Sequence, residues 1–157
     1  MDKKRRDVLK QGGGVTLLSL VAAAGWLKPG EASAQAWNKM AFDAKTMDET
    51  MKALGGGAPA QSKDIAFVST PDIAENGAVV PIGITSSIPK TESIAILIEK
   101  NPNMLAASFD IPAGTDPSVG TRVKMGQSSN VYALVKADGK YYVASKEIKV
   151  TLGGCGG

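Results

Sequence analysis

The most reactive side chain of this 157-residue sequence belongs to its single cysteine, and every neighbour of that cysteine is glycine. The segment is formed by Gly153, Gly154, Cys155, Gly156 and Gly157. Glycine loses more conformational freedom on ordering than any other residue, and chain ends are poorly ordered unless they are tied down. An extended residue spans about 3.3–3.6 Å, so five residues can hold a thiol roughly 15 Å from a folded body. The pattern predicts a thiol on a flexible arm, whereas a structural cysteine would lie in an apolar run.

This thiol lacks the partners that most cysteine chemistry requires. The sequence has no histidine, which excludes a zinc site, a Ser-His-Asp triad and a Cys-His pair within the chain. Glycines bring no charge, and a terminal carboxylate two residues from Cys155 disfavours the thiolate, so only a few per cent of the thiol is expected to be ionised at neutral pH. A catalyst holds its nucleophile in a fixed pocket beside a base. We therefore expect a carrier group on which other proteins act, without a metal or cofactor.

Two other uses of Cys155 stay open. A thiol–disulfide redox protein would need a resolving cysteine or an activating base, and the sequence has neither. A structural sandwich could use the cysteine only to cross-link two chains, since one cysteine cannot form an internal disulfide. Sulfur or sulfonate adducts on the native protein would identify a carrier, and disulfides alone would identify a cross-linker.

The N-terminus has the pattern of an export signal. A basic region precedes the uncharged stretch Gly12–Leu27, and Ala32-Ser33-Ala34 fits an A-x-A cleavage site. The pair Arg5-Arg6 opens the sequence RRDVLK, which resembles the twin-arginine pattern RRxFLK of bacterial exported proteins. The uncharged stretch has 16 residues, fewer than the roughly 18–20 of a spanning helix, which argues against an uncleaved membrane helix. We expect residues 1–34 to be a cleaved twin-arginine signal peptide and the mature protein to be periplasmic.

Removing the leader changes the charge of the chain. Residues 1–34 hold six of the 18 Lys and Arg residues and three of the 15 Asp and Glu residues, so the remainder holds 12 of each. A net charge of zero gives no electrostatic case for binding nucleic acid. The remaining 123 residues suffice for one domain with one core. We expect no association with a membrane.

One amphipathic helix is expected ahead of the strands. Within Trp37–Leu54, apolar side chains recur at spacings of four and three, which places them on one face: Met40, Ala44, Met47, Met51 and Leu54. Asn38 can cap the start and Gly55 can end the helix, so we assign residues 35–60 to the helix and a glycine-rich linker. This face either packs on the chain's own sheet or, because methionine adapts its shape, serves as a docking surface.

Seven short segments with turn residues between them predict an all-β fold, an antiparallel β-sandwich over residues 61–152. Asp138-Gly139 is the strongest hairpin signal, Asn76-Gly77 is a second turn pair, and Pro81 suggests an edge or a bulge. The expected strands are Ile65–Ser69, Ala78–Thr85, Ile94–Glu99 (apolar enough to be buried on both faces), Ala106–Ile111, Thr121–Met125 (where Arg122 and Lys124 alternate with apolar residues), Val131–Lys136 and Lys140–Lys146. Residues 153–157 remain as the arm.

Together these residues resemble the SoxY family, the Y subunit of the sulfur-oxidising (Sox) carrier complex. The glycine-flanked Cys155 is similar to that family's sulfur-carrying motif. Three further stretches resemble the family: PDIAENGAVVP at 71–81, ILIEKNP at 96–102 and VKADGK at 135–140. The resemblance covers essentially the whole mature chain and implies an immunoglobulin-like sandwich.

The resemblance also implies a carrier acted on by enzymes, not an enzyme. Thiosulfate would be joined oxidatively to Cys155, and the intermediates would stay attached while the sulfonate group is hydrolysed and the sulfane sulfur is oxidised. The implied partners are a Z subunit of similar fold in a tight heterodimer and three periplasmic enzymes: a c-type cytochrome that conjugates thiosulfate, a sulfate thiohydrolase and a sulfane dehydrogenase. Export as a preassembled pair would explain a twin-arginine signal on a chain without a cofactor motif.

Overall fold

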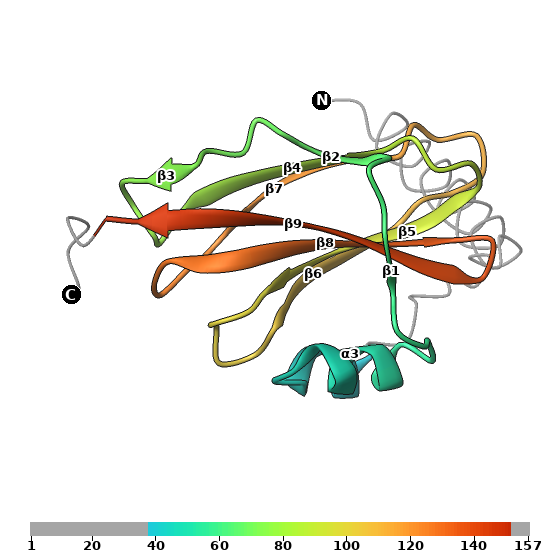
Figure 1. Cartoon of the computed structure of the whole chain (residues 1–157), viewed down its shortest axis with the longest axis horizontal. Coiled ribbons are helices and arrows are strands. Elements are labelled where there is room, and N and C mark those ends of the chain that lie inside the picture. Colours follow the sequence, from blue (N-terminus) through green and yellow to red (C-terminus); the bar gives the residue numbers. More distant parts are fainter. Residues whose placement is uncertain (1–37, 152–157) are drawn as a thin grey trace, which may run out of the picture. The chain divides into compact units, whose positions relative to one another are not determined.

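The computed structural model describes residues 38–151 (Figure 1). Residues 1–37, which include the predicted signal peptide, and residues 152–157, which include the cysteine segment, lie outside the described residues. Within residues 38–151, neither helix has the length and apolar character needed to cross a membrane.

Two β-sheets face each other across the main core. The larger sheet has the strand order β1-β9-β8-β5-β6, with the short β3 also paired to β9, and the smaller sheet has the order β2-β4-β7. All pairs are antiparallel except that β1 and β3 run parallel to β9. The strands are β1 (Ala60–Gln61), β2 (Ile65–Val68), β3 (Ile73–Ala74), β4 (Val80–Ser86), β5 (Thr91–Ile98), β6 (Leu105–Asp110), β7 (Ser118–Val123), β8 (Ser129–Ala137) and β9 (Lys140–Val150).

Alternating side chains fill the space between the sheets. Successive residues of a strand point to opposite faces, so every second residue of β4, β5 and β8 reaches this core. The fully buried members include Ile82, Ile84, Ile94, Ile96, Ile98, Val131, Val135 and Ile148. The other face of β5 is buried too, through Ala95 and Leu97, as the sequence predicted. The all-β sandwich is therefore confirmed, and each of the seven expected segments overlaps a strand.

The expected single helix is two short helices, α2 (Lys39–Asp43) and α3 (Met47–Ala53). Ala44 takes an extended conformation, which ends α2, and its carbonyl accepts a 2.9 Å hydrogen bond from Met104 N–H. Thr46 then caps α3 by accepting from Glu49 N–H at 3.2 Å. The predicted apolar face holds in α3, where Met51 is buried and Met47 and Leu54 pack beside it, but it is wrong at the exposed Met40 of α2. A tertiary hydrogen bond interrupts the helix between them.

Both helices pack on the outer face of the larger sheet, away from β2, β4 and β7 (Figure 1). Their buried apolar side chains, Ala41 and Met51, join a second apolar cluster with residues of β5, β6, β8 and β9. Burial of Met51, which is 3% exposed, contributes about 1.5–3 kcal/mol. Of the two alternatives for the methionine face, packing on the chain's own sheet is observed, although Met40 is 72% exposed.

The structure accounts for two features that the sequence predicted, the hairpin turn at Asp138-Gly139 and the edge or bulge at Pro81. Asp138 and Gly139 have φ of 49° and 72°, the left-handed pair that a two-residue hairpin needs, and they join β8 to β9 as predicted. Pro81 lies in the central strand of the smaller sheet, but β2 pairs with β4 only from Gly83 onward. No β2 residue lies opposite Pro81, so the missing N–H of the proline leaves no hydrogen bond to β2 unformed. At this point β4 is an edge strand.

Candidate functional site

The predicted site residues Gly153, Gly154, Cys155, Gly156 and Gly157 lie outside the described residues. The structure does describe the point from which this segment starts, since Thr151 follows the last residue of β9. The described part of the candidate site is therefore the end of β9 together with the residues that hold it.

The end of β9 is held on both of its edges. On the β8 side, Val150 N–H donates to Ser128 Oγ at 2.9 Å. On the other side, Lys149 N–H donates to the Asp72 carbonyl at 2.9 Å and Thr151 N–H donates to the Ala74 carbonyl at 3.0 Å. Figure 1 shows β3 beside this end of β9. Because the backbone is bonded on both sides, the cysteine segment starts from a fixed position.

Gly77 lies against this end of β9. Its carbonyl accepts from Met125 N–H at 2.7 Å. A Cβ at this position would lie 2.4 Å from the Met125 carbonyl oxygen and 2.8 Å from Val150 Cγ1, both too close for real atoms. The predicted turn at Asn76-Gly77 is present, because Asn76 Oδ1 accepts from Ala78 N–H at 2.9 Å. The sequence did not predict that Gly77 packs so closely on Met125 and Val150. The glycine itself is the local signal for this contact.

A lysine of β9 secures the chain that leads into β3. Lys146 Nζ donates to the Thr70 carbonyl at 2.6 Å and forms an ion pair with Asp72 at 3.0 Å. The Thr70 hydroxyl exchanges hydrogen bonds with the backbone of Gly83, at 3.0 and 3.2 Å. Residues 71–81, one of the stretches that resemble the SoxY family, therefore form the support beside the start of the cysteine segment.

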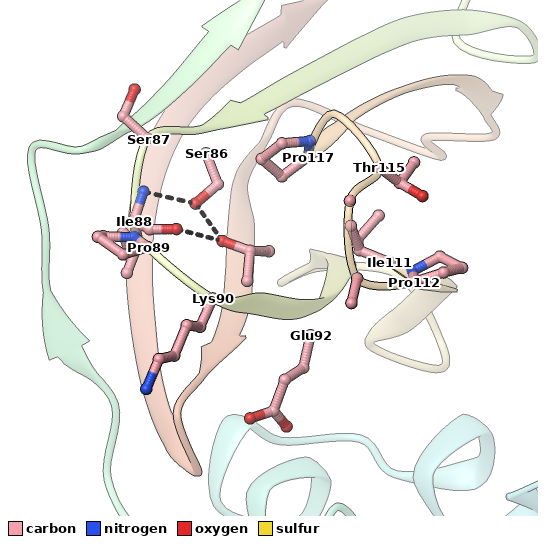
Figure 2. A pocket seen from close by; sticks show the side chains of 13 residues that line it. Ser86, Ser87, Ile88, Pro89, Lys90, Glu92, Ile111, Pro112, Thr115 and Pro117 are labelled. Carbon is pink, nitrogen blue, oxygen red and sulfur yellow. Dashed lines mark hydrogen bonds between the residues drawn. The ribbon is translucent and has the colours of Figure 1, made fainter.

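A separate cavity of about 550 Å³ lies at the opposite end of the sandwich, between the β4–β5 and β6–β7 loops (Figure 2). Ser86 and Thr91 share a 2.9 Å hydrogen bond there, and both also bond to the backbone of Ile88. Glu92 pairs with Lys136 at 3.0 Å and accepts from Gly139 N–H at 3.1 Å. The Lys136 hydrogen bond, followed by that of Gly139, holds the pKa of the Glu92 carboxyl below its usual range.

This cavity is out of reach of Cys155 in the same chain. Glu92 contacts Gly139, directly before β9, whereas the cysteine segment follows the far end of that 11-residue strand. At about 3.3 Å per residue the strand is roughly 35 Å long. Cys155 is four residues beyond Thr151, a span of at most about 14 Å. Among residues 38–151, no group of three or more acidic, histidine or cysteine side chains is placed to hold a metal ion.

The chain is similar to known proteins in both sequence and fold. The family model of the sulfur oxidation protein SoxY matches residues 50–155. The solved structure of the sulfur carrier protein SoxY from Chlorobium limicola f thiosulfatophilum is 38% identical, covering 67% of this chain and 96% of that one, with a TM-score of 0.60. A superoxide reductase (neelaredoxin) from Ignicoccus hospitalis is 18% identical over 55% of this chain and 79% of its own, with a TM-score of 0.48. No curated protein sequence matches.

Proposed function

The chain belongs to the SoxY family of sulfur carrier proteins in sulfur oxidation, and from this premise we propose that it holds thiosulfate-derived intermediates covalently on Cys155. The observation that carries the proposal is the family match, which extends through Cys155 itself and so includes the glycine-flanked thiol. The supported end of β9 fits this role, because it gives the carrier segment a fixed anchor from which the thiol can reach outward.

The proposed loading step is an oxidation. The Cys155 thiol and thiosulfate join through a new S–S bond to give Cys–S–S–SO₃⁻, and they release one proton and two electrons. A c-type cytochrome partner accepts the electrons. Hydrolysis by a second partner then adds water across the terminal S–S bond, releasing sulfate and leaving a persulfide on Cys155. A sulfane dehydrogenase oxidises the remaining sulfur, so every intermediate stays on one atom of this chain.

The glycines support delivery to these partners. Gly153, Gly154, Gly156 and Gly157 have no side chains, so the segment is narrow enough to enter a confined channel. Cys155 lies four residues past Thr151 and extends at most about 14 Å beyond it. The twin-arginine leader supports a periplasmic location, where a Z subunit is proposed to form a heterodimer with this chain.

Replacing the thiol tests the proposal. In a reconstituted system with the partner enzymes, Cys155→Ser is expected to abolish thiosulfate-dependent electron release while leaving the unfolding transition unchanged. A matched control moves the thiol: Cys155→Ser combined with Ser145→Cys places one on the exposed face of β9. This control is also expected to be inactive, because its thiol lacks the glycine arm. Turnover retained by Cys155→Ser would refute the carrier role.

A further inference from the structure

The loop that joins β3 to β4 contains an asparagine whose side chain can react with the main chain. Asn76 is exposed and is followed by Gly77, which packs against the end of β9. The main-chain nitrogen of the residue after an asparagine can attack the carboxamide carbon, which closes a five-membered succinimide ring and expels ammonia. A side chain on that next residue hinders the attack, so glycine permits it most readily.

The other asparagines of the sequence lack this neighbour. Asn38 is followed by lysine, Asn101 by proline, Asn103 by methionine and Asn130 by valine. Proline has no N–H to lose, which blocks the same ring closure at Asn101. Asn103 is exposed as Asn76 is, so it offers a comparison with equal access to water and a bulkier next residue.

A backbone donor already contacts the oxygen that becomes negative during the attack. Ala78 N–H donates to Asn76 Oδ1 at 2.9 Å. Attack on Cγ of Asn76 turns Oδ1 into an oxyanion, and a donor held at hydrogen-bond distance stabilises that charge as an oxyanion hole does. The same bond turns the carboxamide toward the chain that follows it, which is the direction of the Gly77 nitrogen.

The attacking nitrogen has no competing acceptor. Among the hydrogen bonds within residues 38–151, none has the Gly77 N–H as its donor, although the Gly77 carbonyl accepts from Met125 N–H at 2.7 Å. The nitrogen must lose its proton as it attacks, so no protein hydrogen bond is sacrificed in this step. On the other side of the reacting peptide, the Asn76 carbonyl is held by a long bond, 3.3 Å from Val79 N–H.

We propose that Asn76 is a deamidation site of the folded protein, and that one of its two products loosens the anchor of the cysteine segment. The Gly77 nitrogen displaces ammonia from the carboxamide, and water then opens the succinimide at either carbonyl. One opening gives aspartate. The other gives isoaspartate, which places an extra methylene group in the main chain directly before Gly77. Water is the only co-reactant, and both products add one negative charge.

The two products differ in their effect on the end of β9. Gly77 fits so closely that a Cβ there would lie 2.4 Å from the Met125 carbonyl oxygen and 2.8 Å from Val150 Cγ1. An extra methylene lengthens the main chain by about 1.5 Å, one carbon–carbon bond. Isoaspartate therefore either breaks the Gly77–Met125 hydrogen bond or displaces Val150. Aspartate keeps the ordinary main chain and still accepts from Ala78 N–H, so it leaves the anchor in place.

Peptide mapping of the aged protein tests the site. The folded protein is incubated at mildly alkaline pH, and its peptides are analysed by mass spectrometry with chromatographic separation of aspartate and isoaspartate. We expect modification at Asn76 to be at least several-fold faster than at Asn103, and no slower in the folded protein than in the same protein unfolded in urea. A folded protein that stays unmodified at Asn76 while the unfolded one reacts, or equal rates at Asn76 and Asn103, would overturn the assignment.

Hydrogen exchange tests the effect on the anchor. The Val150 and Thr151 amides should exchange several-fold faster in the isoaspartate form than in fresh protein. Asn76→Asp, which adds the charge without the methylene, should keep the protection of fresh protein. Asn76→Gln, whose longer side chain would have to close a less favourable six-membered ring, should keep it through the same incubation. Unchanged exchange in the isoaspartate form, or equal loss in Asn76→Asp, would contradict the proposed loosening whatever group Cys155 carries.

Discussion

Gly77→Ala is expected to destabilise the base of the cysteine segment. The new methyl group would lie 2.4 Å from the Met125 carbonyl oxygen and 2.8 Å from Val150 Cγ1, so the ends of β7 and β9 must separate by several tenths of an ångström. The first of these atoms belongs to the backbone and cannot rotate away. Overpacking of this kind costs about 1–3 kcal/mol in the free energy of unfolding. With a typical urea m-value, the midpoint of unfolding should fall by on the order of 1 M.

The matched control is Gly120→Ala, in β7 of the smaller sheet. A Cβ at Gly120 meets no atom within 4 Å, and its φ is not left-handed. This substitution is expected to be neutral or to stabilise by up to about 1 kcal/mol through the unfolded chain. Hydrogen exchange adds a local measurement, because the amides of Val150 and Thr151 should exchange faster in Gly77→Ala alone. Equal urea midpoints for the two variants would contradict the packing described at Gly77.

Further predictions concern the thiol, its glycines and one carboxylate. Gly154→Val or Gly156→Val should slow transfer to the partner enzymes with no change in thermal stability, and unchanged transfer kinetics would count against a confined channel. Without reductant, mild oxidation should couple two Cys155 thiols, visible as a dimer on a non-reducing gel that a reductant removes. The pKa of Glu92 is lowered by Lys136, so its contribution to stability is present above the ordinary carboxyl value of 4.5 and is lost as pH falls through the lower folded value. Glu92→Gln should therefore flatten the acid side of the stability–pH curve, and a curve that keeps its slope would show that this pair contributes nothing.

Local patterns predicted the parts of the fold that depend on neighbouring residues. Alternating apolar residues located the longer strands, and Asp138-Gly139 located a hairpin, since both signals act within a few residues. The helix break could not be predicted this way, because the Ala44 carbonyl bonds to Met104, 60 positions along the chain. β1 and β3 were missed for a similar reason: each has two residues, and each exists only through pairing with β9.

The candidate site also combines residues that local sequence predicts with contacts that depend on distant parts of the chain. The sequence predicted Cys155 and its glycines as the reactive segment, because residue type and spacing carry that information. It did not predict the fixed start of the cysteine segment, which depends on contacts from Ser128 and β3 that come together only in the folded chain.

Intact-mass measurement of the protein, purified without reductant from cells oxidising thiosulfate, tests the central claim most directly. A carrier should show a population with the added mass of a thiosulfonate or a persulfide, which peptide fragmentation places on Cys155 and which a reductant removes. Protein isolated under the same conditions with Cys155 only as free thiol or as a protein–protein disulfide would contradict the proposed function.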